Sequence, residues 1–453
     1  MNYSVSSFLA SLVERIAILV HALLGIVLAR PIFWFCLLVP LSITVYGRDN
    51  TLVIGRPPII PITAVFVLLA ALRGGVKRVV STWRASPAMF WLHVLVCAVE
   101  VFLMFYHRNP SGWAYMGGRV AFFAVLLTTV AHCDDVNAVK DALKGLAYGV
   151  GVIGLLTLIH VLRIVDLPFA LPVWPSRTFG PIRMPLPRTL GLAMSPNRFG
   201  ILAAVALATA MAGAGGDERI VRPSWARALL FCVVMAAAAI SQTRGVYLTV
   251  LLTLGLGGIL LLASERATQW LASTKEAWLT AGSYAVLLIL ANVVFPVVAP
   301  EWIVDVGIEV NGANVDLRDD ANAMGWLLFK QAPLLGIGHG MFLRVTPLSE
   351  GIHNHFWEQL VSTGILGGIP YLLFHMLILV SALRLIGSSR SSVKAVAKAL
   401  IVSVSATYLA YQFFPGFFTP VFAVVCGLVL SAQREEQQLS RPANEEIRDS
   451  NPA

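Results

Sequence analysis

The chain has few charged residues and few cysteines, and each shortage excludes a class of protein. Only 13% of its 453 residues are Asp, Glu, Lys or Arg, whereas 57% are hydrophobic. Soluble domains carry roughly a quarter charged residues, so the composition excludes an ordinary soluble domain and predicts a multi-pass membrane protein. The cysteine count is odd and no Cys-x-x-Cys occurs, so neither a disulfide framework nor a zinc site is indicated. The five cysteines are Cys36, Cys97, Cys133, Cys232 and Cys426.

The apolar residues fall into runs long enough to cross a bilayer. The amino-terminal sequence lacks a basic leader with a small-residue cleavage site, so we expect it to begin the first span. The fold class that follows is an all-α, polytopic membrane protein with about 12 transmembrane helices. The candidate spans are 8–29, 31–46, 57–72, 88–106, 117–132, 145–163, 197–213, 227–241, 246–264, 277–298, 364–386, 394–412 and 415–431.

Short basic loops alternate along the chain in the way that a multi-pass topology requires. By the positive-inside rule these loops lie in the cytoplasm, together with the charged tail 433–453, which we expect to be disordered. The net charge of +9 then serves mainly to anchor the chain, so we expect membrane lipids and not nucleic acid as its partner. The basic loops are 73–84, 132–144, 216–227, 264–275 and 388–398.

This topology leaves three segments on the opposite, external face: 164–196, the turn 241–245 and the long loop 299–354. Spans occupy the rest of 1–298 and, after the loop, 355–432. Arginine on this face runs against the charge bias, and anionic lipid headgroups could explain only one or two of them. Arginines that converge from three loops therefore predict a polyanionic ligand. They are Arg177, Arg183, Arg188, Arg244, Arg318 and Arg344.

The stretch 333–368 gathers three histidines, His339, His353 and His355, beside Asn354. Ionisable residues packed beside a bilayer are costly unless they serve a function. His353 opens a predicted helix at the water–membrane boundary, where a neutral imidazole can accept a proton from a sugar hydroxyl. The alternative is an interfacial histidine that only caps or packs, and the arginine-rich face favours the catalytic interpretation.

The residues before these histidines predict a surface helix and a turn. Segment 322–331 has helical spacing, with Met324, Leu327 and Leu328 on one side, and is too short to span. We expect it to lie on the outer membrane surface as an amphipathic helix that covers the site. The glycine-rich run 336–340 predicts a tight turn that could act as the hinge of this cover.

A metal site is disfavoured by the spacing of its possible ligands. Asp319 or Asp320 could join His353 and His355, but residues two apart on a helix point to different sides. We therefore expect neither a metal nor another cofactor.

Each arginine of interest has a competing interpretation. Arg244, between two short apolar runs, either grips phosphate or pairs with an acid from another span, such as Glu100. Arg188, at the end of another predicted span, likewise either binds phosphate or pairs with an acidic residue. Arg318 is flanked by acidic residues, so a local salt bridge competes with ligand binding. These neighbours are Asp316, Asp319 and Asp320.

Four sequence elements, in order, resemble those of the bacterial O-antigen ligases and of the O-antigen polymerases and protein O-oligosaccharyltransferases related to them. The first three are SPNRFG (195–200), SQTRGVYL (241–248) and PLLGIGHGMF (333–342). The fourth is the family pattern His-Asn, nine residues, Gly, two residues, Gly, here His353-Asn354 followed by Gly364 and Gly367. The motifs cover about 185–375, and they distinguish the superfamily better than its members.

The resemblance implies a metal-independent, C-type glycosyltransferase-like architecture with its active site facing the periplasm of a bacterial inner membrane. The implied donor is a polysaccharide on undecaprenyl pyrophosphate, and the implied acceptor is lipid A-core. Arg188, Arg244 and Arg318 would hold the pyrophosphate and stabilise its developing charge. His353, with Asn354 beside it, would orient or deprotonate the acceptor hydroxyl in a single inverting displacement. His339 is a second candidate base.

Two kinds of alternative remain. A polymerase or a protein O-oligosaccharyltransferase would use the same donor, and only the acceptor distinguishes them. A lipid-linked oligosaccharide flippase or transporter should place charges along a cavity within its spans. The predicted spans are nearly free of charge and polarity is concentrated on one face, which favours an enzyme over a transporter.

Overall fold

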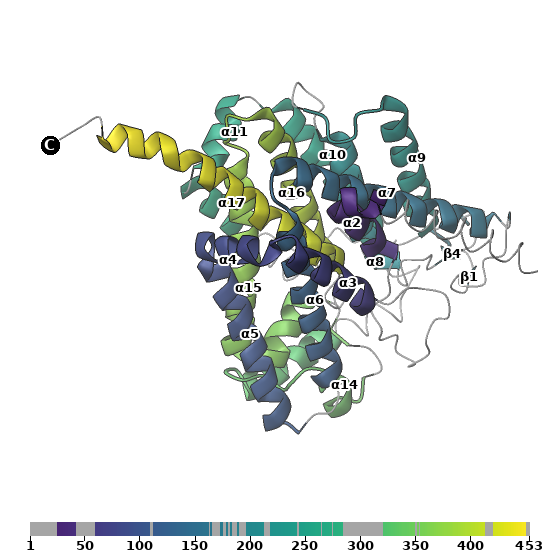
Figure 1. Cartoon of the computed structure of the whole chain (residues 1–453). Helices are drawn as coiled ribbons and strands as arrows, with labels where there is room; N and C mark the ends of the chain where they lie inside the picture. The colour runs from purple at the N-terminus through teal and green to yellow at the C-terminus, as the bar shows by residue number, and fades with distance from the viewer. Residues whose placement is uncertain are drawn as a thin grey trace, which may run out of the picture.

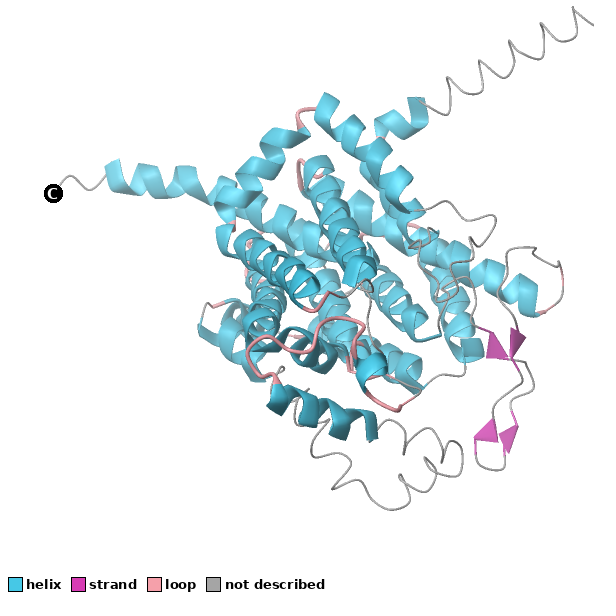
Figure 2. Ribbon diagram, turned by 90° about the horizontal axis from the view of Figure 1, so that it is seen from below, coloured by secondary structure: helices cyan, strands magenta, loops and turns pink. Residues whose placement is uncertain are grey.

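The computed structural model shows a bundle of helices with four two-residue strands at one side (Figures 1 and 2). It describes residues 25–41, 59–108, 112–162, 164, 173–174, 178–179, 182–183, 188–189, 196–212, 218–241, 244–263, 265–273, 275–283, 320–348, 351–352, 354–412 and 420–449. The strands pair in antiparallel fashion, β1 (Val173–Trp174) with β4 (Arg188–Thr189) and β2 (Thr178–Phe179) with β3 (Ile182–Arg183).

The helices follow the apolar runs closely. Outside the numbered series, the described residues also form helices over 25–29, 275–283 and 320–331. The numbered ones are α2 (Pro31–Leu41), α3 (Ile59–Leu72), α4 (Gly75–Ala85), α5 (Pro87–Tyr106), α6 (Gly112–His132), α7 (Val136–Val161), α8 (Pro196–Met211), α9 (Ser224–Ser241), α10 (Arg244–Leu262), α11 (Glu265–Ala272), α14 (Phe342–Val345), α15 (His355–Leu385), α16 (Ser391–Ala410) and α17 (Pro420–Asp449).

Seven helices are long and apolar enough to cross a membrane, which supports a multi-pass membrane protein. They are α5, α6, α7, α9, α10, α15 and α16. Helices α2, α3 and α8 are apolar but shorter, with 11, 14 and 16 residues. The predicted total of about 12 spans is therefore not reached in the described residues. Most of the predicted runs 8–29 and 277–298 lies outside the described residues.

Helices α8, α16 and the first half of α17 form the buried centre of the bundle. Small residues let the surrounding helices approach one another. Gly145 and Gly149, four residues apart on α7, face α2, where an added Cβ would overlap the carbonyl of Phe33 or lie 2.5 Å from that of Leu37. This close crossing is the packing that a Gly-x-x-x-Gly pattern favours between membrane helices.

The predicted cytoplasmic loops are tied to one another at one end of the bundle, here called the basic end. Among these contacts, a hydrogen bond from Lys140 holds the pKa of the Glu218 carboxyl below its usual value. The arrangement agrees with the predicted alternation of loops, although the side of the membrane stays a prediction. The ties join Arg78 to the Ala131 carbonyl (2.6 Å), Lys140 to Glu218 (2.6 Å), Arg390 to Glu435 (3.1 Å), Lys394 to Glu265 (3.1 Å) and Arg434 to the Cys133 carbonyl (2.5 Å).

Three segments at the basic end are more ordered than the sequence suggested. Loop 73–84 is mostly helix α4, and loop 264–275 contains helix α11. The tail 433–453, expected to be disordered, instead continues α17 as a helix to Asp449 and leaves the bundle (Figure 1). The residues after Ser431 explain the difference, since Ala, Gln, Arg, Glu and Leu are strong helix formers even where charge is high.

The opposite end, here called the site end, carries the last turns of α5, the start of α6, helix 320–331, α14 and the start of α15. The predicted surface helix 322–331 is confirmed as a helix over 320–331. Met324 and Leu328 pack on a small second core that includes Ile352 and Val361, whereas Leu327 is 52% exposed. One face of this helix therefore rests on protein.

Candidate functional site

Helix α15 is broken near the site end. Gly364 has φ 60° and ψ −164°, so the helix consists of a short arm, 355–363, and a long apolar part, 365–385. A break inside a span leaves backbone groups without helical partners, and these groups need partners from elsewhere in the protein.

The glycine-rich turn supplies those partners. The amides of Ile337 and Gly338 donate to the Val361 and Ser362 carbonyls at 3.1 and 2.8 Å. The amides of Ile365 and Leu366 donate in turn to the carbonyls of residues 333 and 334, at 2.8 and 3.1 Å. The break and the turn 333–338 are thus one hydrogen-bonded unit, here called the clasp. Four backbone hydrogen bonds hold this turn to α15, and the hinge at Gly336, Gly338 and Gly340 stays a prediction.

The arm begins at Asn354, which caps it. Asn354 Oδ1 accepts a hydrogen bond from the Trp357 amide at 3.0 Å, and Nδ2 donates to Gln412 Oε1 at 2.8 Å. An N-cap of this kind satisfies one of the open amides in the first turn. The His355 amide donates to the Tyr411 carbonyl at 2.8 Å, so the start of the arm is fixed to the end of α16.

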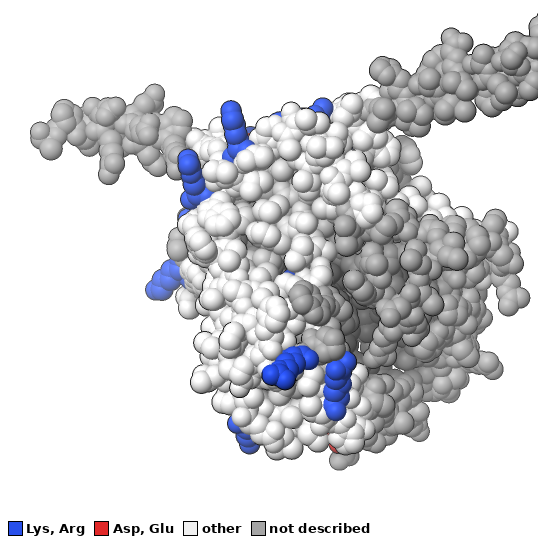
Figure 3. Space-filling view, turned by 60° about the horizontal axis from the view of Figure 1, so that its bottom comes forward, with Lys and Arg blue, Asp and Glu red and all other residues white. Residues whose placement is uncertain are grey.

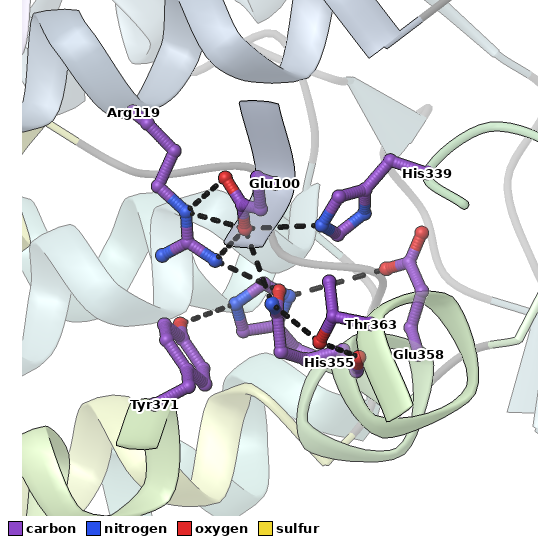
Figure 4. A network of polar contacts seen from close by, with 8 residues as sticks. Glu100, Arg119, His339, His355, Glu358, Thr363 and Tyr371 are labelled. Atoms are coloured by element: carbon purple, nitrogen blue, oxygen red, sulfur yellow. Dashed lines mark hydrogen bonds and ion pairs between the residues drawn. The ribbon is translucent and has the colours of Figure 1, made fainter. Parts of the chain in front are cut away.

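A buried ion pair lies beside the arm (Figure 4). Arg119 of α6 donates to Glu100 of α5 through Nη2 at 2.5 Å and through Nε at 2.8 and 2.9 Å. Their side chains are 1% and 3% exposed. The Arg119 guanidinium also lies over the Tyr371 ring at 4.6 Å, and the Tyr371 hydroxyl is hydrogen-bonded to His355 Nε2 at 2.6 Å.

His339, from the glycine-rich turn, joins the same group. Its Nε2 donates to Glu100 Oε1 at 3.1 Å, and its ring stacks on Tyr115 at 4.7 Å. His339 and Tyr115 line a small hollow together with Glu100. Apolar side chains, Leu103, Met104 and Met116, form the other walls. His339 thus fastens the clasp to α5 while it also borders the hollow.

Gln359 connects the arm to the ion pair through both ends of its amide. Its Oε1 accepts from Arg119 Nη2 at 2.8 Å, and its Nε2 donates to Glu100 Oε1 at 3.1 Å. The same Nε2 lies 3.2 Å from Thr363 Oγ1, one residue before the break. Gln359 is 1% exposed, so all of these bonds are made away from water.

The site residues expected from the sequence are only partly visible. Of the two expected bases, His339 is described with its side chain, whereas His353 lies outside the described residues. Asn354, which follows His353 in the sequence, is described with its side chain. Arg318 lies outside the described residues too. Arg188 pairs with Trp174 in the β1–β4 ladder, and Arg244 begins α10, but their side chains are not described.

The ion pair bears on two expectations. Glu100 pairs with Arg119, the partner that the sequence could not assign, whereas the pairing of Arg244 with an acid stays a prediction because its side chain lies outside the described residues. The spans are also not nearly free of charge, because both members of the pair lie inside long apolar helices. The signal was present in the sequence, since isolated charges in spans are rare and usually face a partner or a cavity. The partners could not be assigned because the sequence gives no helix–helix contacts.

Among the described residues, the exposed charged side chains at the site end are mostly basic. Figure 3 shows Lys and Arg side chains on this face and almost no Asp or Glu among the described residues. Lys330 and Arg344 are exposed there. No three His, Cys, Asp or Glu side chains come together as possible metal ligands anywhere in the part of the chain that the structure describes.

No protein-family model matches the sequence, and no curated protein is significantly similar to it.

Proposed function

We propose that this protein is a glycosyltransferase of the O-antigen ligase type, which transfers a polysaccharide from undecaprenyl pyrophosphate to lipid A-core at the periplasmic face of the bacterial inner membrane. One observation carries the proposal. Asn354, the described half of the His-Asn element, caps the broken arm of α15 next to a dense buried polar cluster. The site end that holds it also exposes cationic side chains.

The chemistry follows from the charges of the substrates. Arg188, Arg244 and Arg318 would bind the donor pyrophosphate, since guanidinium groups bind phosphate in bidentate geometry. His353 would take the proton of the acceptor hydroxyl as its oxygen attacks the anomeric carbon. The bond from that carbon to the pyrophosphate oxygen breaks, its electron pair stays on the pyrophosphate, and the configuration inverts. Cationic side chains would stabilise the leaving group, so we expect no metal and no cofactor.

An O-antigen polymerase or a protein O-oligosaccharyltransferase would share this donor chemistry. The three activities differ in the acceptor, which is a second lipid-linked glycan, a protein hydroxyl or lipid A-core. A direct comparison uses the purified chain in vesicles with one labelled donor and each acceptor in turn. Label that moves to lipid A-core alone supports the ligase, and label that moves only to another acceptor reassigns the protein within the group.

A transporter of lipid-linked glycans is the second candidate, and the ion pair favours it. Buried charges within spans and a broken helix are common where transporters bind their substrates. A flippase would move the labelled donor between leaflets without forming a new glycosidic bond. Donor that becomes accessible on the other leaflet, with no glycan joined to any acceptor, would favour the transporter over the enzyme.

A further inference from the structure

We propose that Gln359 is a positioning residue for the arm 355–363. The two ends of its amide are hydrogen-bonded to the two members of the Glu100–Arg119 ion pair, and these bonds set the orientation of the arm. The His-Asn element lies at the start of this arm. The inference rests on the proposed function in placing the reaction at that element. It adds a role for the buried ion pair, which the transfer chemistry itself does not use.

The break at Gly364 makes a positioning device necessary. A continuous helix would carry the direction of its long apolar part into the arm through uninterrupted backbone hydrogen bonds. Here the backbone turns at φ 60°, so the long part of α15 does not dictate where the arm points. The contacts of the arm with the rest of the protein must define its direction.

Those contacts hold the arm at three levels. At its start, Asn354 and the His355 amide bond to the end of α16. At its end, the Val361 and Ser362 carbonyls are held by the clasp. Between these, Gln359 is the link to α5 and α6.

The middle contact is the most selective of the three. The amide oxygen of Gln359 requires a donor and its nitrogen requires an acceptor, and Arg119 and Glu100 present them side by side. The two charged partners are themselves locked together, so the surface that Gln359 contacts is rigid. Hydrogen bonds to charged groups are stronger than those between neutral groups. A small rotation of the arm would break both bonds.

Replacement of Gln359 tests the role without disrupting the ion pair. In Gln359→Leu, Glu100 keeps its bonds to Arg119 and His339, so no buried charge is left alone. Gln359→Met, with an unbranched side chain, is the second variant if the first folds poorly. The matched control is Gln269→Leu, because Gln269 is exposed on α11 at the basic end.

Two measurements follow on the full-length protein in lipid nanodiscs. Backbone amide exchange of residues 355–363 should speed up about tenfold in the Gln359 variants, the equivalent of losing about one buried hydrogen bond, while α16 and the control variant stay unchanged. The transfer rate should fall about tenfold in kcat, with KM for the lipid-linked donor within about twofold of the wild type, because a misplaced group slows the chemical step more than it weakens binding.

The outcomes separate the two proposals. Unchanged exchange in the arm overturns the positioning role, whatever the activity. Faster exchange with unchanged kcat also overturns it, because the arm would then loosen without consequence for the reaction. If the wild-type protein transfers no glycan to any acceptor, the proposed function fails. Faster exchange in the Gln359 variants would still support the role of Gln359 in holding the arm.

Discussion

Gly336 and Gly364 meet backbone to backbone, although 28 positions separate them in the sequence. A Cβ on Gly336 would lie 2.5 Å from the Ser362 carbonyl group, and one on Gly364 would overlap the Leu334 carbonyl. Both residues have positive φ, 68° and 60°, a backbone conformation that residues other than glycine rarely adopt. The glycine-rich turn and the Gly-x-x-Gly that follows the His-Asn element are therefore two halves of one structural unit, the clasp.

Alanine at either glycine should destabilise the protein. The positive φ alone costs about 1–2 kcal/mol, and the overlap with fixed backbone adds to it. We expect Gly336→Ala and Gly364→Ala each to lower the temperature at which the detergent-solubilised protein aggregates, as followed by fluorescence-detected size exclusion. Gly258→Ala on α10 is the control, because no atom lies within 4 Å of the position that a Cβ would take there and alanine favours the helix. Equal stability of all three variants would contradict the clasp.

The Glu100–Arg119 pair should show strong coupling in a double-mutant cycle. Removal of one partner leaves the other charge buried, which costs about 3–5 kcal/mol, whereas removal of both is much less costly. We expect Glu100→Leu and Arg119→Leu to be severely destabilised in mixed-micelle unfolding, and the double variant to recover most of the loss. The partly exposed pair Lys394–Glu265 serves as the control, with coupling below about 1 kcal/mol. Additive single effects at Glu100 and Arg119 would show that they do not interact as described.

Asn354 should be sensitive to the identity of its side-chain oxygen. Asn354→Ala removes the N-cap and should cost about 0.5–2 kcal/mol. Asn354→Asp keeps an acceptor for the Trp357 amide but loses the donor to Gln412, so its stability should fall between those of the wild type and the alanine variant. Unfolding in mixed micelles ranks the variants. An aspartate variant no more stable than the alanine variant would argue against the capping role.

The sequence predicted the helical fold well because spans are long and the apolar signal accumulates over many residues. It also placed the helix 320–331 to within two residues at its start, since amphipathic spacing is a local property. It failed for the tail after Ser431, where charge suggested disorder but local helix propensity extends α17.

The site was harder to predict because its key contacts are long-range. Glu100, Arg119 and Gln359 come from three helices, and their meeting is decided by helix packing that no local pattern encodes. The glycines were recognised as a turn, but the close approach of Gly336 to the backbone around Gly364 could not be predicted from the sequence. Lone charges inside apolar runs were the available clue to the ion pair.

The side of the membrane is directly testable with thiol labelling. Cys232 is exposed, so the experiment begins from a Cys232→Ala background. Cysteines at Asn322 and Gln331, both exposed on helix 320–331, should react with an impermeant reagent from the periplasm. A cysteine at Lys275, also exposed and in a predicted cytoplasmic loop, should react only after the membrane is opened. The reverse pattern would invert the topology and place His353 on the wrong side for the proposed reaction.

The most direct test of the central claim is glycan transfer by the purified protein in the presence of EDTA. The reaction contains undecaprenyl-pyrophosphate-linked polysaccharide and lipid A-core, and the product is resolved by gel mobility and mass spectrometry. The account predicts glycosylated lipid A-core at the same rate with and without chelator, and its loss in His353→Ala. An absence of product with the wild-type protein, or activity that EDTA abolishes and Mg²⁺ or Mn²⁺ restores, would contradict the proposed metal-independent ligase.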